Sequence, residues 1–569
     1  MVLGVNVHYE ILGRRSKSWT ILEVIKDRAA ATDKATTLWN SKQFNGVRIL
    51  KESYDKETHA FSSVEIFSRG ATGVKSKYDQ TGTVTPCLTP DDLYSADGRR
   101  SIWELMQNTL SDWRITPTEL LHSLEHYYKL YNTGTKLQDA VQRTAVSFEN
   151  EEGSIQERMR KIYKVIEASV DIMKGTKDKV PSLEMGRLKP VIESLEKAPN
   201  KKFLLMCGLV EYLRPTVTLT DKFGRIAVFL ANHHPDWVTE ILDQLLADFL
   251  NHPPVLDQLL GDHESRDSFI TQIAYLQAGK VTDLMEQDPS QSFNKDIIRL
   301  SGFLVEGSLP LTSYALFDRL KTEINAAKPI NENGLIAQLT SLRALHEVLR
   351  NLDMDIHALD AIGEDLAARA GRLINSQSVS DLMEEYKNPI KKVNALLDLE
   401  AVTVGGINKR TVANFILPIL SRPEYETVFM GLDSQPVQRM NDLVALQKKV
   451  KVTDLTEMHK RKIAEKLDEF CRTILDNTQI LKKIHQLNIS LQEKSEKILI
   501  MMADDFFTDG DCRNRAEQQV RLYMKQEGFT SGLIEGLARQ AAEEKLIEFK
   551  TLLSQAGLKK VETDQQDTL

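Results

Sequence analysis

The chain has 569 residues, too many for one hydrophobic core, and a typical domain size of about 150 residues predicts three or four folding units. With 41% hydrophobic and 27% charged residues it has ample material for buried cores, and its net charge of −8 does not indicate a nucleic-acid-binding protein. The four cysteines form no CxxC pair, which argues against a zinc knuckle or a disulfide framework and favours reduced thiols in a cytoplasmic protein.

No membrane span or secretory signal is expected. The longest apolar runs, such as residues 203–210, are far shorter than the roughly 18 residues that a spanning helix needs. The first seven residues lack the basic stretch and apolar core of a signal peptide.

Residues 1–69 predict a small α+β domain. Val5, Val7, Tyr9 and Ile11 alternate with polar residues, the period of a half-buried strand, and residues 19–25 are rich in β-branched and aromatic residues. A helical pattern over 32–43 precedes strand patterns at 47–54 and 61–67. The predicted order is therefore β-β-α-β-β.

From residue 101 the pattern becomes helical and remains so. Residues 70–100, rich in Gly, Thr, Ser and Asp, predict a linker or an extended arm. Thr116 and Glu119 around Pro117 predict a helix start. Prolines separate the later helical patterns, and no fixed repeat emerges, so irregular helical packing is expected rather than a solenoid. The predicted helical domains are 101–310 and 311–436.

The longest uninterrupted helical stretch is Val437 to Asp509, 73 residues without Gly or Pro. Asp454 with Glu457, and Ser490 with Glu493, match capping boxes and predict helix starts at these points. We therefore expect a C-terminal long-helix bundle, a helical hairpin or a coiled coil over 437–556, and a frayed tail over 557–569.

A heptad count through this stretch gives an apolar stripe that is a candidate partner-contact surface. Its apolar members are Leu467, Phe470, Ile474, Leu481, Ile484, Leu491 and Ile498. Other apolar residues widen the stripe beyond a coiled-coil seam, which favours packing within the chain over an intermolecular coiled coil. The apolar pattern is compatible with both alternatives.

Three motifs suggest chemistry, and each has a simpler structural explanation. Residues 504–511 resemble a calcium loop but lack two of its oxygen ligands, so a turn is expected, with Asp511 capping the next helix. His233, His234 and Asp236, interrupted by Pro235, lack the spacing of a helical metal site. The glycines near residues 70 and 405 lack Walker A spacing. No catalytic residue, metal ligand or cofactor is therefore predicted.

Arg14, Arg15 and Lys17 carry the one nucleic-acid hypothesis. They form a basic hairpin tip that is a weak candidate for contacts with an anion or with nucleic acid.

The sequence thus predicts a multidomain, mainly all-α protein with a small N-terminal α+β domain. The leading interpretation is a non-enzymatic cytoplasmic regulatory or scaffold protein. It acts through protein contacts or self-association of its helical region, with the N-terminal domain as a docking or sensing module. An enzyme whose site forms only in three dimensions is the first alternative, and nucleic-acid binding through the hairpin is the second.

Overall fold

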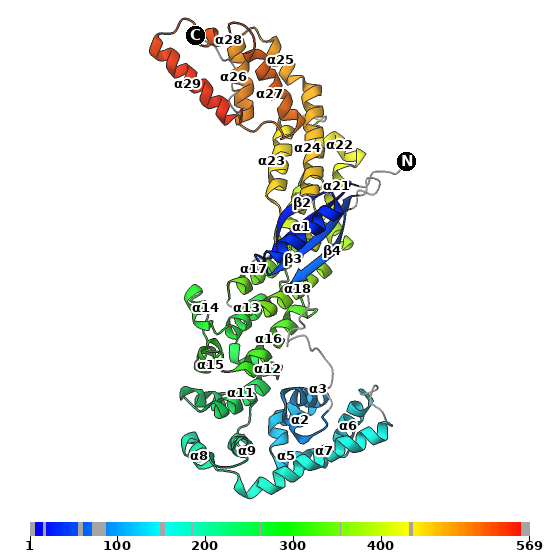
Figure 1. Cartoon of the computed structure of the whole chain (residues 1–569), viewed down its shortest axis with the longest axis vertical. Coiled ribbons are helices and arrows are strands. Elements are labelled where there is room, and N and C mark those ends of the chain that lie inside the picture. Colours follow the sequence, from blue (N-terminus) through cyan, green and yellow to red (C-terminus); the bar gives the residue numbers. More distant parts are fainter. Residues whose placement is uncertain are drawn as a thin grey trace. The chain divides into compact units, whose positions relative to one another are not determined.

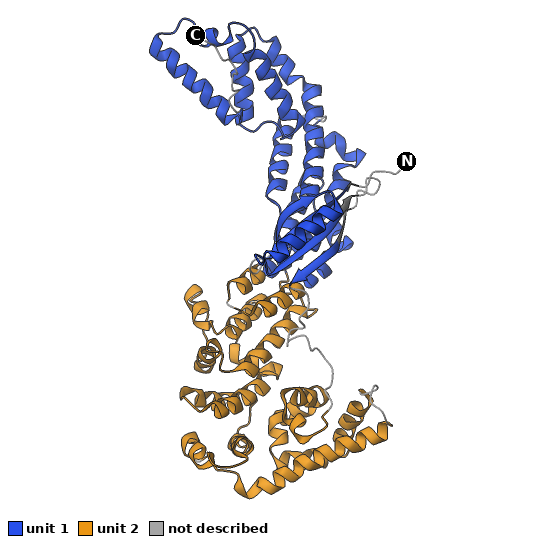
Figure 2. Ribbon diagram, viewed as in Figure 1, with its two compact units in different colours: residues 1–72, 333–343, 367–569 blue, residues 73–332, 344–366 orange. Residues whose placement is uncertain are grey.

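The structure is a computed structural model that describes residues 6–14, 19–54, 61–70, 87–147, 154–183, 186–261, 263, 265–352, 354–431 and 436–558. The chain forms two compact units (Figure 2). Unit 1 comprises residues 1–72, 333–343 and 367–569, and unit 2 comprises residues 73–332 and 344–366. The fold is mainly helical with a small N-terminal α+β region, as the sequence predicts.

The N-terminal part of unit 1 is a four-stranded antiparallel sheet with one helix (Figure 1). Its elements are β1 (Asn6–Arg14), β2 (Trp19–Ile25), α1 (Arg28–Asn40), β3 (Gly46–Tyr54) and β4 (Phe61–Gly70), so the predicted β-β-α-β-β order is confirmed. The strands lie in the order β2-β1-β3-β4. Asp27 caps α1 by accepting a hydrogen bond from the Ala30 amide, so the helix begins before the predicted range of 32–43.

The two faces of this sheet differ in chemistry. Ile11, Val47 and Ile49 pack against Ala31 and Ala35 of α1 and form the apolar core. Side chains alternate along a strand, so the other face carries the residues between them.

That second face is charged and nevertheless buried. It includes His8, Glu10 and Glu52, and His8 lies opposite Glu52 in the β1–β3 register. The guanidinium of Arg410, on α21 (Gly406–Leu420), lies 3.1 Å from Glu52 Oε1. An ion pair therefore links the N-terminal sheet to a helix more than 350 residues later in the sequence, within the same unit.

The remaining helices of unit 1 come from the second half of the chain, although they belong to the same compact unit as the N-terminal sheet (Figure 1). They are α19 (Ser376–Glu384), α20 (Pro389–Val402), α21, α22 (Pro423–Phe429), α23 (Pro436–Val452), α24 (Glu457–Thr478), α25 (Ile480–Gln486), α26 (Leu491–Ala503), α27 (Asp511–Met524), α28 (Phe529–Ile534) and α29 (Arg539–Gln555). The helices α17 (Leu335–Asn351) and α18 (Ile356–Leu373) contain the boundaries between the two units.

The stretch 437–509 is four helices rather than one rod. The predicted capping box of Ser490 and Glu493 is confirmed at the start of α26. The box expected at Asp454 is wrong, because Thr456 caps α24 by accepting from the His459 amide. A further break follows Thr478, since Gln479 adopts a left-handed conformation with φ of 52°.

The start of α27 also differs from expectation. Asp511 is the first residue of the helix, not its cap. The cap comes from Asp468 of α24, whose carboxylate accepts from the amides of Asp511 at 2.7 Å and Cys512 at 3.2 Å. Gly510 precedes them with φ of 146°, and a Cβ there would lie 2.5 Å from Asp468 Oδ2. Only glycine therefore allows the carboxylate so close.

Unit 2 is helical. Its elements are α2 (Pro90–Tyr94), α3 (Ala96–Trp113), α4 (Pro117–Leu121), α5 (Leu124–Tyr131), α6 (Thr135–Ser147), α7 (Ile155–Thr176), η1 (Lys177–Lys179), α8 (Leu188–Leu195), α9 (Lys201–Leu213), α10 (Leu219–Ala227), η3 (Val228–Ala231), α11 (Asp236–Leu250), α12 (Pro253–Leu260), α13 (Arg266–Gln277), α14 (Val281–Gln287), α15 (Lys295–Val305) and α16 (Pro310–Asn325).

Several predicted boundaries in unit 2 need correction. The sequence predicts a linker or an extended arm over 70–100, but the chain is helical over α2 and the start of α3, and residues 71–86 lie outside the described ranges. The helix start predicted at Thr116 and Glu119 is confirmed, and the two residues form a capping box there. The helix ends at Leu121, and α5 begins separately. Residues 266–287 form two helices, α13 and α14, separated where Gly279 turns with φ of 71°. Across the described ranges, no helix combines the length and hydropathy that a bilayer crossing requires.

Candidate partner surface and ligand cavity

The predicted apolar stripe divides into an interior part and a surface part. Leu467, Phe470 and Ile474 of α24 and Ile498 of α26 are all buried within unit 1. The Phe470 ring stacks on that of Phe429, with 5.0 Å between centroids. These four side chains therefore pack against the protein's own helices.

The other stripe residues lie at the surface, around α25. Leu481 and Ile484 on α25, and Leu491 at the start of α26, are only half-buried. No residue of α25 is fully buried, and Leu487, just after the helix, is 42% exposed. The cause is the left-handed turn at Gln479, which redirects the chain after α24. We call Ile480, Leu481, Ile484 and Leu487 the α25 surface.

Basic groups flank the α25 surface. Lys482 and Lys483 are exposed, and neither forms an ion pair with another described residue. His485 anchors the helix, because its Nδ1 lies 3.0 Å from the Tyr523 hydroxyl and its ring stacks on that of Tyr523. The surface therefore combines aliphatic side chains with uncompensated positive charge.

Arg14, predicted to lie at an exposed basic hairpin tip, is instead buried in the sheet. Arg14 is the last residue of β1, is paired in register with Trp19 and Gly46, and is only 4% exposed. Arg15 and Lys17 lie outside the described residues. The sequence pattern places Arg14 in the hairpin tip, whereas strand β1 continues through Arg14.

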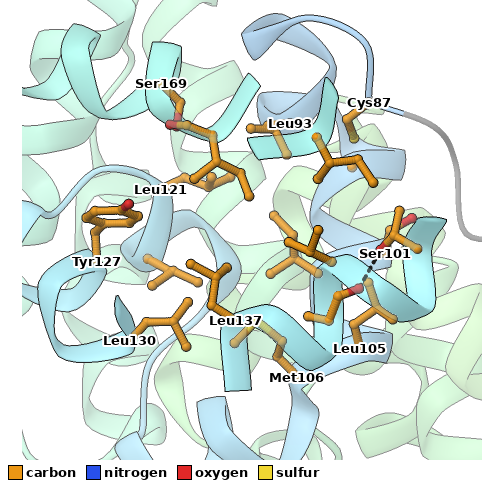
Figure 3. Close-up of a pocket in the computed structure, with 18 of the residues that line it drawn as sticks. Cys87, Leu93, Ser101, Leu105, Met106, Leu121, Tyr127, Leu130, Leu137 and Ser169 are labelled. Atoms are coloured by element: carbon orange, nitrogen blue, oxygen red, sulfur yellow. Dashed lines mark hydrogen bonds between the residues drawn. The ribbon is translucent and has the colours of Figure 1, made fainter. Parts of the chain in front are cut away.

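Unit 2 contains an apolar cavity of about 110 Å³ among α2 to α7 (Figure 3). On α7, Ile162, Ile166, Ser169 and Met173 recur at spacings of four and three, so they share one helix face. The other lining residues come from five helices and the segment before α2: Cys87, Leu93, Gly98, Ser101, Ile102, Leu105, Met106, Leu120, Leu121, Tyr127, Leu130, Leu137, Ala140, Val141 and Thr144.

The lining of the cavity carries no charged side chain. Two of its hydroxyls already donate within their own helices, from Thr144 to the Ala140 carbonyl and from Ser169 to the Ile166 carbonyl, both at 2.8 Å. Burial raises the pKa of the Cys87 thiol to about 11 and also raises the pKa of the Tyr127 phenol. Both groups are therefore neutral at physiological pH.

Buried charges near this region hold helices together. Asp248 of α11 accepts from Arg99 Nε at 3.1 Å and from the Thr118 hydroxyl at 2.6 Å. Lys222 Nζ of α10 lies 2.6 Å from Glu119 Oε1 of α4, and burial raises the pKa of Glu119. Through these contacts the buried charged side chains hold α3 and α4 against α10 and α11. This pattern could not be read from the sequence, because the partners are more than 100 residues apart.

Of the two histidines singled out in the sequence, His234 has a structural contact, whereas His233 is exposed. His234 Nε2 donates to the Phe229 carbonyl at 2.8 Å, and Asp236 begins α11. His252 packs on Trp103 with 4.0 Å between ring centroids, and burial lowers its pKa to about 3. Among the described residues no three His, Cys, Asp or Glu side chains are grouped to hold a metal ion.

Comparison with known proteins gives no relative: no family model, curated protein or solved structure matches the chain.

Proposed function

We propose that this protein is a non-enzymatic regulatory or scaffold protein that binds a partner protein through the α25 surface. The observation that supports this most directly is the position of α25, which has four large aliphatic side chains in or beside it and buries none of its own residues. Exposed apolar clusters rimmed by polar groups are characteristic of protein-interaction sites.

The occupant we propose is an amphipathic helix of another protein with acidic residues beside its apolar face. Ile480, Ile484 and Leu487 follow one another at spacings of four and three, which gives an aliphatic ridge that a helix can pack against. Lys482 and Lys483 supply positive charge beside the ridge, so carboxylates on the partner would be favoured. A second copy of this chain would bring the same lysines together and is disfavoured by repulsion.

The N-terminal α+β region is proposed to serve as a docking module for the chain's own helices. Support comes from the Glu52–Arg410 ion pair between β3 and α21. In this proposal the sheet stabilises the helices of unit 1, which include α25.

Two synthetic amphipathic peptides with the same leucine stripe, flanked by Glu in one and by Lys in the other, test the charge preference. Fluorescence anisotropy with the full-length protein is expected to show at least tenfold tighter binding of the acidic peptide. An Ile484→Asp variant should weaken that binding about tenfold, equivalent to about 1.4 kcal/mol. Val452→Asp is the matched control, because Val452 is 82% exposed and lies outside the α25 surface.

A photo-crosslinking amino acid placed at Leu487 or at Val452 tests the site in the native cell. A discrete protein adduct is expected from position 487 only, and it should disappear when Ile484→Asp is added. Equal affinity for both peptides, or binding unaffected by Ile484→Asp, contradicts the proposal. A concentration-dependent dimer in sedimentation velocity that Ile484→Asp abolishes would instead assign the surface to self-association.

A further inference from the structure

The apolar cavity lies in unit 2 and is independent of the α25 surface, which belongs to unit 1. We propose that this cavity binds a small, neutral, apolar molecule of the size of one aromatic ring or a short alkyl chain. The volume, the chemistry of the lining and the exposure of one wall each support this assignment.

The volume sets the size of the ligand. At about 110 Å³ the cavity has the same order of size as the engineered apolar cavity of about 150 Å³ that takes up benzene or xenon. It is several times larger than the space that one water molecule requires. A single ring or a chain of a few carbon atoms would fill it.

The lining selects against water and against charge. A buried water typically needs about three hydrogen bonds, and most of the wall is aliphatic. The hydroxyl protons of Thr144 and Ser169 are already donated to backbone carbonyls. A carboxylate or an ammonium group would lose its hydration without gaining a counter-charge, because no charged side chain lines the space. Tyr127, at one side of the cavity in Figure 3, offers a phenol to a ligand with one polar group.

The wall formed by α7 and α3 provides access. Ile162 and Ile166 of α7, and Ile102 and Leu105 of α3, are only half-buried although they line the cavity. Rotation of such side chains is fast and would admit a small molecule without unfolding the helices. In contrast, Leu130 and Met173, which also line the cavity, are almost fully buried and form its fixed part.

The test uses the full-length protein with 1-hexanol and indole as neutral probes, and with hexanoate and hexylamine as charged analogues. Isothermal calorimetry and ligand-observed NMR are expected to detect saturable binding of the neutral probes, with at least tenfold weaker binding of the charged ones. Filling the cavity by Ala140→Phe should weaken binding at least tenfold. Val146→Phe is the matched control, since Val146 lies on the same helix, is 42% exposed and does not line the cavity.

Circular dichroism establishes that each variant is folded. If Ala140→Phe does not fold, Leu137→Phe replaces it, because Leu137 is a half-buried lining residue where added volume can be accommodated. Saturable binding of neutral probes that is lost in the filled variant and retained in Val146→Phe supports the proposal. Failure of both neutral probes to bind the wild-type protein, or equal affinity in the filled variant, overturns it. Because α25 plays no part in these measurements, their outcome is separate from that of the partner-surface experiment.

Discussion

The sulfur atoms of Cys471 and Cys512 lie 3.3 Å apart, although 41 residues separate them in the chain. Cys471 is on α24 and Cys512 is in the first turn of α27, and both are fully buried. The hydrogen bond from Cys512 lowers the pKa of Cys471, and the same bond raises the pKa of Cys512. The thiolate that forms first is therefore that of Cys471.

This geometry predicts that a two-electron oxidant joins the two residues. The sulfur atoms need to approach by only about 1.2 Å to reach the disulfide bond length of about 2.05 Å. With diamide, the two thiols lose two protons and two electrons, which reduce the N=N bond of the reagent to a hydrazine. In a Cys87→Ser/Cys207→Ser background, intact-mass spectrometry should show the loss of two hydrogen atoms, and Cys512→Ser should abolish it. Reaction should be slow in buffer and faster in moderate urea, because both thiols are buried. Alkylation of both thiols after diamide treatment in urea would contradict the prediction.

Asp468→Ala is expected to destabilise the start of α27. The Asp468 carboxylate accepts from the Asp511 and Cys512 amides and from the Thr508 hydroxyl at 2.6 Å. Loss of a helix cap together with buried donors left unpaired costs about 2–4 kcal/mol. Hydrogen exchange of the amides in 511–524 should therefore accelerate. Asp476→Ala is the control, because Asp476 forms an exposed ion pair with Arg515, and such pairs contribute about 0–1 kcal/mol.

Lys222→Met is expected to make the stability of unit 2 more sensitive to pH. Burial raises the pKa of Glu119, and Lys222 counteracts that rise, so removing the lysine raises the pKa further. The folded protein therefore favours the protonated carboxyl of Glu119. Its contribution to stability is complete below the ordinary pKa of 4.5 and is lost as the pH rises through the raised pKa of the folded state. At pH 7.5 the variant should lose about 3–5 kcal/mol by urea unfolding, and it should recover part of this at pH 5. The Glu119→Gln/Lys222→Met double variant should be closer to wild type, whereas an equal loss in both would disprove the coupling.

His252→Phe is expected to make the stability of unit 2 less sensitive to low pH. Burial lowers the pKa of His252 from 6.5 to about 3, so the unfolded chain binds a proton that the folded chain does not. The stability contributed by the neutral ring is complete above pH 6.5 and is lost as the pH falls toward 3. Between pH 6.5 and pH 5 this amounts to about 2 kcal/mol. Phenylalanine preserves the ring contact with Trp103, so the variant should lose correspondingly less over the same interval in urea titrations. An unchanged pH dependence would show that His252 titrates normally.

The sequence by itself determined the local structure of this protein. Alternation of apolar and polar residues near Val7 and Tyr9 predicted the strands, and helical periodicity predicted most of the helices. The helix start at Thr116–Glu119 and the capping box of Ser490 and Glu493 could be predicted because all the partners lie within four residues of one another. The surface part of the candidate site, Leu481 and Ile484, was also visible as an apolar stripe. However, the stripe did not distinguish these residues from Leu467 and Ile474, which are buried.

Only the tertiary structure decided which surfaces meet. A periodic pattern states which face of a helix is apolar but not which helix covers it, so the separation of buried from exposed stripe residues depends on the turn at Gln479. The same reason applies to Asp468 at the start of α27, to Cys471 beside Cys512, and to Glu52 beside Arg410, whose partners are 41 or more residues away. The cavity in unit 2 is the clearest case. Each lining residue has the pattern of an ordinary core position, and the empty space exists only because six helices meet around small side chains such as Ala140.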